Sequence, residues 1–163
     1  MRDTRGVATV EFALWSLLIF ATLLPSLDFA AYLIFQGRLA SAVQQGSMLA
    51  YNMRNSDTIN TSQLISYVSA SGGAPTATIT TTVTCNGGSQ SCAVPVTSRQ
   101  CTCVSGLTPT YTAAAACGLP CANGATSGYY LTITASYPYH AMTVPDQWLD
   151  GSIMKRAETV RLQ

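Results

Sequence analysis

The longest run of apolar residues lies near the N-terminus, from Val7 to Phe35, and its middle, from Phe12 to Leu27, has no charged residue. Glu11, Pro25 and Asp28 interrupt the run. A helix rises about 1.5 Å per residue, so about 20 apolar residues cross the hydrocarbon layer of a membrane. The run therefore predicts a transmembrane helix. A cleaved signal peptide is the alternative, but its apolar core would be shorter, about 7 to 15 residues.

A helical pattern continues beyond this run. Apolar residues recur at intervals of three and four, at Leu39, Ala42, Val43, Gly46, Leu49, Ala50 and Met53. This spacing places them on one face of a helix. We expect one rod to about Met53, with a transmembrane half at 7–28, an extracytoplasmic half at 29–54, and room for a kink at Pro25. A second helix is predicted near 60–70, because Asn60 and Gln63 suit a capping box and Gly72 is a stop signal.

After Pro75 the chain becomes rich in Thr, Ser, Gly and Cys. Segments 76–84, 129–137 and 152–162 are rich in β-branched residues and are predicted strands, although the last could also be a helix end. A loop of about forty residues, 85–128, separates the first two strands. A loop of this length is uncommon in a compact domain, so we expect covalent cross-links to hold it. The predicted class is α+β, with a long N-terminal helix followed by a small disulfide-stapled antiparallel sheet domain. This β-rich domain covers 55–163, with a Cys-rich insert at 85–121.

The composition argues against several classes of function. The chain is 48% hydrophobic and 9% charged, whereas soluble domains carry about 25% charge, so a freely soluble cytosolic protein is not expected. A net charge of +1 gives no electrostatic surface for nucleic acid. One histidine and one lysine leave little material for acid/base chemistry. With no G-x-S-x-G, H-E-x-x-H or phosphate-binding loop, we expect neither an enzyme nor a cofactor.

The cysteines are even in number and clustered: Cys85, Cys92, Cys101, Cys103, Cys117 and Cys121. Because Arg2 and Arg5 precede the apolar run, the positive-inside rule puts the N-terminus in the cytoplasm and the cysteines in an oxidising space. Six cysteines allow 15 pairings. We expect a local bridge from Cys85 to Cys92 across the turn 86–88, with Cys101 and Cys103 bridging separately to Cys117 and Cys121. Zinc is the alternative, but a C-x2-C knuckle is missing.

The residues before and inside the apolar run are the most informative. A charged leader, MRDTRG, ends in Gly6, Val7 follows, and Glu11 is the fifth residue counted from Val7. This resembles a type IV prepilin signal. The resemblance implies that a prepilin peptidase cuts between Gly6 and Val7 and that Glu11 pairs with the Val7 amine of a neighbouring subunit. A carboxylate in the bilayer centre costs about 2.5 kcal/mol or more and persists for a function. Otherwise, Glu11 lies at the interface of an ordinary signal anchor.

The strings RGVATVEFAL, LDFAAYL and LASAVQQGSMLAYN resemble the TadE-like proteins of tight-adherence (Flp) pilus systems. The likeness covers residues 5–54 well and 129–163 loosely, and the Cys-rich insert lies outside it. Two short segments depart from the family: Ala30-Ala31 replaces Gly-Arg, and Gln45-Gly46-Ser47 replaces Arg-Gly-Ala.

The resemblance implies a minor pseudopilin of a bacterial inner membrane, with a cytoplasmic N-terminus and a periplasmic or extracellular domain, that is incorporated into a surface pilus. Its implied partners are other pilin subunits, the prepilin peptidase, the inner-membrane assembly platform and the lipid bilayer. The alternative is an unprocessed bitopic membrane protein with a small extracytoplasmic binding module. Gly6 and Glu11 discriminate between the two.

Two further features allow two interpretations each. Asp28 could pair with a cation on a neighbouring subunit or membrane partner, but we favour its marking where the helix leaves the bilayer. The aromatic residues could form an adhesive patch, although core packing is the commoner use of tyrosine in strands. They are Trp15, Tyr32, Tyr129, Tyr130, Tyr137, Tyr139 and Trp148.

Overall fold

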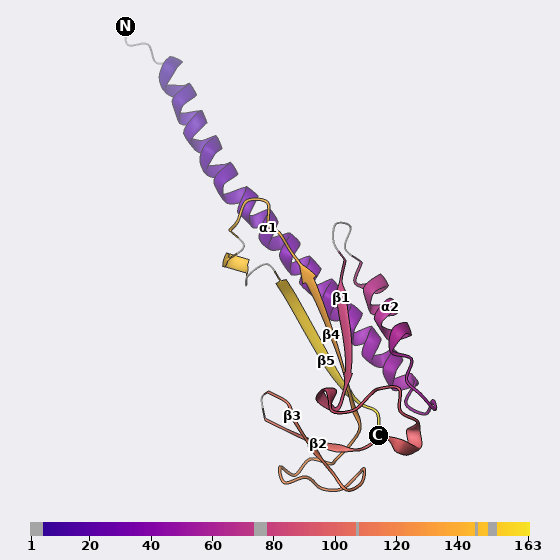
Figure 1. The fold of residues 1–163 in the computed structure, drawn as a ribbon. Helices are drawn as coiled ribbons and strands as arrows, with labels where there is room; N and C mark the ends of the chain where they lie inside the picture. Colours follow the sequence, from indigo (N-terminus) through magenta and orange to yellow (C-terminus); the bar gives the residue numbers. More distant parts are fainter. Residues whose placement is uncertain (1–4, 74–77, 107, 146, 150–152) are drawn as a thin grey trace.

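The structure is a computed structural model, and it describes residues 5–73, 78–106, 108–145, 147–149 and 153–163. The helices are α1 (Arg5–Asn52) and α2 (Thr61–Ser71), and two short 3-10 turns are η1 (Asn86–Gly88) and η2 (Val96–Ser98). The strands are β1 (Thr80–Cys85), β2 (Thr102–Ser105), β3 (Thr110–Ala113), β4 (Tyr130–Pro138) and β5 (Ile153–Arg161). The predicted α+β class is confirmed, because a long N-terminal helix is followed by a small antiparallel sheet domain with three disulfides (Figure 1).

Helix α1 is a single rod that continues through Pro25 and ends at Asn52, one residue before the predicted end. Its C-terminal half lies along the sheet domain, while its N-terminal half extends beyond it (Figure 1). The predicted apolar stripe supplies the buried face of the C-terminal half, at Leu39, Ala42, Val43, Gly46 and Ala50. The helix therefore contributes to the core over only part of its length.

Helix α2 begins and ends where the local signals predicted. The Asn60 side chain accepts a hydrogen bond from the Gln63 N–H at 3.0 Å, which caps the first turn. At the other end, the Gly72 N–H donates to the Val68 carbonyl. Val68 is fully buried and faces α1 at Gly46, where a Cβ atom would lie 2.5 Å from Val68 Cγ2. A glycine at this position lets the two helices approach closely.

The main sheet has the order β1-β4-β5, and both pairings are antiparallel. Along β4, buried side chains alternate with half-buried ones, so that Leu131, Ile133, Ala135 and Tyr137 point into the core. The helices α1 and α2 pack against this sheet. Segment 152–162, which allowed a strand or a helix end, is strand β5 over Ile153–Arg161 and pairs with β4 along its whole length. Strand β1 covers only part of the predicted 76–84, of which 76–77 lie outside the described residues.

The prediction of a loop over 85–128 was wrong in part. This segment contains the hairpin of β2 and β3, with Thr102 paired to Ala113 and Ser105 paired to Thr110. A ladder between Thr102 and Gly128 joins the hairpin to the chain just before β4. The insert therefore has ordered backbone pairing in addition to its disulfides.

Candidate functional site

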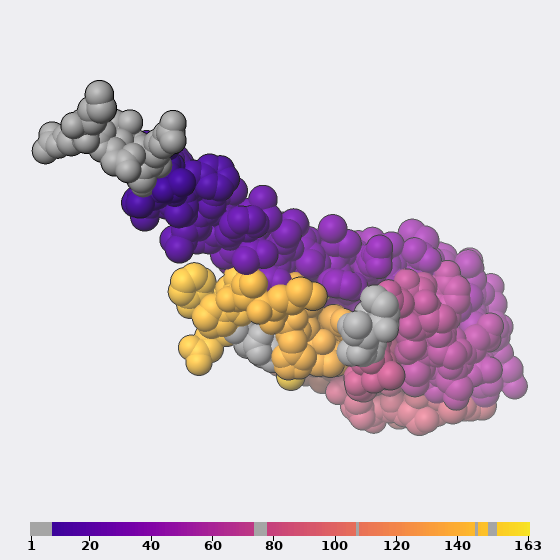
Figure 2. Space-filling model, turned by 90° about the horizontal axis from the view of Figure 1, so that it is seen from above, coloured from indigo at the N-terminus to yellow at the C-terminus, as the bar shows by residue number. Residues whose placement is uncertain are grey.

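The N-terminal half of α1 projects from the sheet domain as an apolar rod, seen in indigo in Figure 2. Its exposed apolar side chains are Val10, Phe12, Leu14, Trp15, Leu17, Leu18, Ile19, Phe20, Leu23, Leu24 and Leu27. An 18-residue window of this helix has a mean hydropathy of 1.9 and is only 6% buried. Within the described part of the chain it is the one helix long and apolar enough to cross a membrane. The core helix of a soluble protein is mostly buried, whereas this segment of α1 is mostly exposed.

Three hydroxyl groups of the rod, those of Ser16, Thr22 and Ser26, are satisfied within the helix. Ser16 Oγ donates to the Phe12 carbonyl at 2.8 Å, and Ser26 Oγ donates to the Leu23 carbonyl at 2.7 Å. Thr22 Oγ1 lies 3.1 Å from the Leu18 carbonyl, in the same pattern. Polar groups without partners are costly in hydrocarbon. These internal bonds make the helix surface compatible with lipid.

Glu11 lies on the exposed surface of this rod, one to two turns before Leu14, Trp15 and Leu18, with which it lines a shallow apolar depression. The predicted processing residues, Gly6 and Val7, fall in the first helical turn, and their side chains are outside the described set. Glu11 is thus separated from Val7 by four residues of helix, a rise of about 6 Å.

Asp28 anchors the sheet domain to α1. Its carboxylate accepts hydrogen bonds from three successive backbone N–H groups, of Met142 at 3.2 Å, Thr143 at 2.7 Å and Val144 at 3.1 Å. The Thr143 hydroxyl donates a fourth. The side chain is buried, with 6% of its surface exposed. The interpretation of Asp28 as a simple boundary marker was therefore incomplete: its contacts are internal, to a loop over a hundred residues away.

The aromatic residues around this anchor form core instead of a surface patch. Tyr139 donates its hydroxyl to the Asp28 carbonyl at 3.0 Å, and its ring packs edge-on against Tyr32 at 5.6 Å between centroids. Phe35 stacks on Tyr137 at 5.6 Å. Burial raises the pKa of the Tyr139 phenol, and the Asp28 carboxylate raises it further. These contacts fix the end of β4 against the helix.

The other residues of the expected aromatic patch are dispersed. Tyr129 is fully buried, whereas Trp15 and Trp148 are exposed on different parts of the molecule. Tyr130 is half-buried, with its ring 6.3 Å from that of Tyr111 in the hairpin. An adhesive surface made by all seven residues is therefore not formed.

Three disulfides join all six cysteines: Cys85 to Cys92, Cys101 to Cys117, and Cys103 to Cys121. The local pair was predicted, and the other two fit the expectation that Cys101 and Cys103 bridge separately. The paired sulfur atoms leave no thiolate for the zinc alternative. The chain turns after Cys85 as expected, with Gly87 at a φ of 68° beside the Tyr111 ring, which a Cβ atom would meet at 2.4 Å.

Asn86 is the polar centre of the insert. Its side-chain oxygen accepts from Thr102 Oγ1 at 3.1 Å and from the Tyr130 N–H at 3.0 Å, and its amide donates to the Gln100 carbonyl at 2.7 Å. The side chain is 1% exposed. One buried amide therefore connects the ends of β1, β2 and β4.

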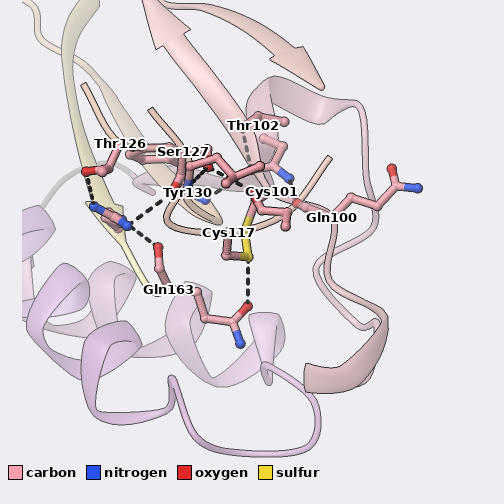
Figure 3. Close-up of a disulfide and its surroundings, with 12 residues drawn as sticks. Gln100, Cys101, Thr102, Cys117, Thr126, Ser127, Tyr130 and Gln163 are labelled. Atoms are coloured by element: carbon pink, nitrogen blue, oxygen red, sulfur yellow. Dashed lines mark hydrogen bonds between the residues drawn. A yellow bond between two sulfur atoms is a disulfide. The ribbon is translucent and has the colours of Figure 1, made fainter. Parts of the chain in front are cut away.

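The C-terminal residues close the insert from the other side (Figure 3). Arg161 donates to Thr126 Oγ1 at 2.9 Å and to the carbonyls of Ser127 at 3.0 Å and Gln163 at 2.6 Å. The Gln163 side-chain oxygen lies 3.9 Å from Cys117 Sγ. The Cys101–Cys117 bridge is thus held against the end of β5.

Arg99 joins the insert to the segment after α1. Its guanidinium donates to the carbonyls of Arg54 at 2.7 Å and Ser56 at 2.9 Å, and lies over the Tyr129 ring at 5.4 Å from the centroid. Burial raises the pKa of the Tyr129 phenol, and the Arg99 charge opposes this rise. Sequence reasoning missed both Arg99 and Asn86, because their partners lie far away along the chain.

Comparisons with protein-family models, curated proteins and solved structures return no match for this chain. The exposed apolar helix, Glu11 and the disulfide-linked domain are the features of the chain that bear on its function.

Proposed function

We propose that this chain is a minor pseudopilin, a structural subunit for the assembly or initiation of a Tad-type (Flp) pilus. One observation carries the proposal: the N-terminal half of α1 is an uncovered apolar rod with Glu11 on its surface, while its C-terminal half is built into a disulfide-stapled domain. A rod of this kind needs lipid or other helices around it, because the apolar surface it exposes is too large for water.

In this proposal, Glu11 directs the packing of the rod against the rod of a neighbouring subunit. Cleavage after Gly6 by a prepilin peptidase would create a free amine at Val7. When subunits pack side by side, the Val7 amine of one chain meets the Glu11 carboxylate of the next, and each buried charge gains a partner. Removing either partner would leave the other charge unpaired in an apolar surrounding, which is strongly destabilising.

The same proposal accounts for the two ends of the molecule. Arg2 and Arg5 retain the leader in the cytoplasm, where the peptidase and the assembly platform act. The domain then lies outside the inner membrane, where the disulfides can form and persist. The cysteine bridges thus support an extracytoplasmic position of the domain, independently of the leader.

The proposal is tested at Glu11 in cells that make the pilus. Glu11→Ala should still insert and be processed, but pili should be lost or greatly reduced in number, as counted by electron microscopy. Glu11→Asp keeps the charge and should restore part of the assembly, whereas Glu11→Gln should not. Normal pili with Glu11→Ala and Glu11→Gln would contradict the charge-pairing role and favour the unprocessed bitopic protein.

A further inference from the structure

The tip of the sheet domain lies beside α1 at Asp28, the first buried residue of the helix, while Phe29, Leu33 and Ile34 further along it stay exposed. The backbone N–H groups of Met142, Thr143 and Val144 bind the Asp28 carboxylate, so the loop after β4 is fixed at the level of residue 28. In Figure 2 the gold and yellow segments form the end of the domain nearest the projecting helix. The described residues of this loop, 139–145 and 147–149, and the start of β5, at Ile153, are called the tip below.

The tip exposes three large apolar side chains. Met142 is 95% exposed, Trp148 is 73% exposed and Ile153 is 61% exposed. Single exposed apolar residues are ordinary on protein surfaces. Here the three exposed side chains belong to a part of the chain whose neighbouring residues Val144 and Leu149 are buried in the core.

The length of the rod sets where the tip would lie in a membrane. Residues 8–27 form the stretch of α1 before its first buried residue, Asp28, and as a helix they span about 30 Å, which is the thickness of the hydrocarbon layer. A helix that crosses the bilayer with this stretch therefore brings Asp28 and the attached tip to the outer lipid–water boundary. Tryptophan is enriched at that boundary because its ring is amphipathic.

We propose that the tip docks on the outer surface of the same bilayer, with Met142, Trp148 and Ile153 in the interfacial lipid region. The occupant is lipid because the hydrogen bonds to Asp28 hold the tip beside the end of the helical stretch that crosses the bilayer. The docking sets the orientation of the domain relative to the membrane before the subunit enters an assembly. The inference depends on the membrane-spanning helix of the proposed function, and it is independent of pilus incorporation.

The test uses the two tryptophans of the chain as depth reporters. The full chain is reconstituted in phosphatidylcholine nanodiscs whose lipids are brominated either near the headgroup or near the chain ends. In Trp15→Phe, Trp148 is the remaining tryptophan, and its emission should be quenched more by headgroup-proximal bromine. In Trp148→Phe, Trp15 should show the reverse order, because it lies 13 residues before Asp28 in the helix.

A matched control places a tryptophan on the same helix outside the membrane. Met48 is 69% exposed and lies about 30 Å beyond Asp28 along α1. Met48→Trp, made together with Trp15→Phe and Trp148→Phe, should show no quenching by either lipid. Quenching of this control variant would reveal non-specific contact between the domain and the nanodisc.

Two results would overturn the inference. In the first, neither brominated lipid quenches the emission of Trp148 in Trp15→Phe, although the emission of Trp15 in Trp148→Phe is quenched. The other is a Trp148 that becomes protected from acrylamide only as the protein concentration rises, which would assign the tip to a second copy of the chain. Both leave the proposed function standing, whereas an unquenched Trp15 would remove the membrane helix and both proposals with it.

Discussion

Asp28 shows how a charged residue can be kept at the end of an apolar helix. Its carboxylate is buried, and three consecutive backbone N–H groups and one hydroxyl supply its hydrogen bonds. Hydrogen bonds to an ionised acceptor are stronger than neutral ones. The donors come from residues 142–144, so no local pattern around Asp28 could have predicted this role.

Asp28→Asn should release the loop at 142–144. An amide has one oxygen to accept and an NH2 group that would face backbone donors, so at least part of the four-bond set is lost. Amide hydrogen exchange of Met142, Thr143 and Val144 should become faster, and the thermal midpoint of the domain should fall.

Thr143 offers matched variants for this anchor. Thr143→Ser retains the hydroxyl and should behave like the parent chain, while Thr143→Ala should show a smaller effect than Asp28→Asn. Unchanged exchange at 142–144 in Asp28→Asn would show that the carboxylate does not hold the loop.

The sequence predicted the structural roles of some other residues and missed those of others. The Asn60 cap depends on a contact three residues away, and the bridge from Cys85 to Cys92 crosses a short glycine turn, so both were predictable. Asn86 and Arg99 act through partners that only tertiary structure brings together. Long-range polar contacts have no periodicity, which is why the sequence did not indicate them.

At the scale of elements, the periodicity predicted α1, α2 and the strands of the main sheet. It failed at β2 and β3, which are only four residues each, with the sequences TCVS and TYTA. Such strands are too short to show alternation. Two disulfides tie the β2 region to the segment after β3, and Asn86 accepts a hydrogen bond from Thr102 at the start of β2.

The packing of α1 on α2 can be tested with two glycines of the same helix. Gly46→Ala places a Cβ atom 2.5 Å from Val68 Cγ2 and 3.2 Å from Ile133 Cδ1. We expect it to lower the free energy of unfolding by about 1–3 kcal/mol, as overpacked cores do. Guanidinium denaturation of the chain in detergent micelles measures this change.

Gly37 is the control, because a Cβ atom there meets nothing within 4 Å. Gly37→Ala should be neutral or raise the free energy of unfolding by about 0.5–1 kcal/mol, since alanine is the better helix former. If Gly46→Ala were as well tolerated as Gly37→Ala, the close contact of α1 with α2 and β4 would be wrong.

The whole molecule combines two parts with different surroundings. The rod has an exposed apolar surface, and the domain has a small core strengthened by three disulfides. The sequence predicted this division, because the two parts differ sharply in composition. It could not predict how the domain attaches at Asp28, which depends on tertiary contacts.

The disulfides should stabilise the domain more when they close longer loops, because the entropy lost by the unfolded chain grows with the logarithm of loop length. Cys103 and Cys121 are separated by 18 residues, and Cys85 and Cys92 by 7. Replacing the first pair by serine should cost about 3 kcal/mol, and replacing the second about 2 kcal/mol. Thermal unfolding in the presence and absence of reductant checks the set as a whole, and an unchanged midpoint in reductant would refute a stabilising framework.

Mass spectrometry of the N-terminus of the protein extracted from membranes tests whether the chain is processed as a pilin-like subunit. We expect a mature chain that begins at Val7, so that Glu11 becomes its fifth residue. A chain that begins at Met1 would contradict processing and leave Glu11 without its proposed partner. A start beyond Leu27 would also contradict the account, because it would make the protein a secreted disulfide-rich domain.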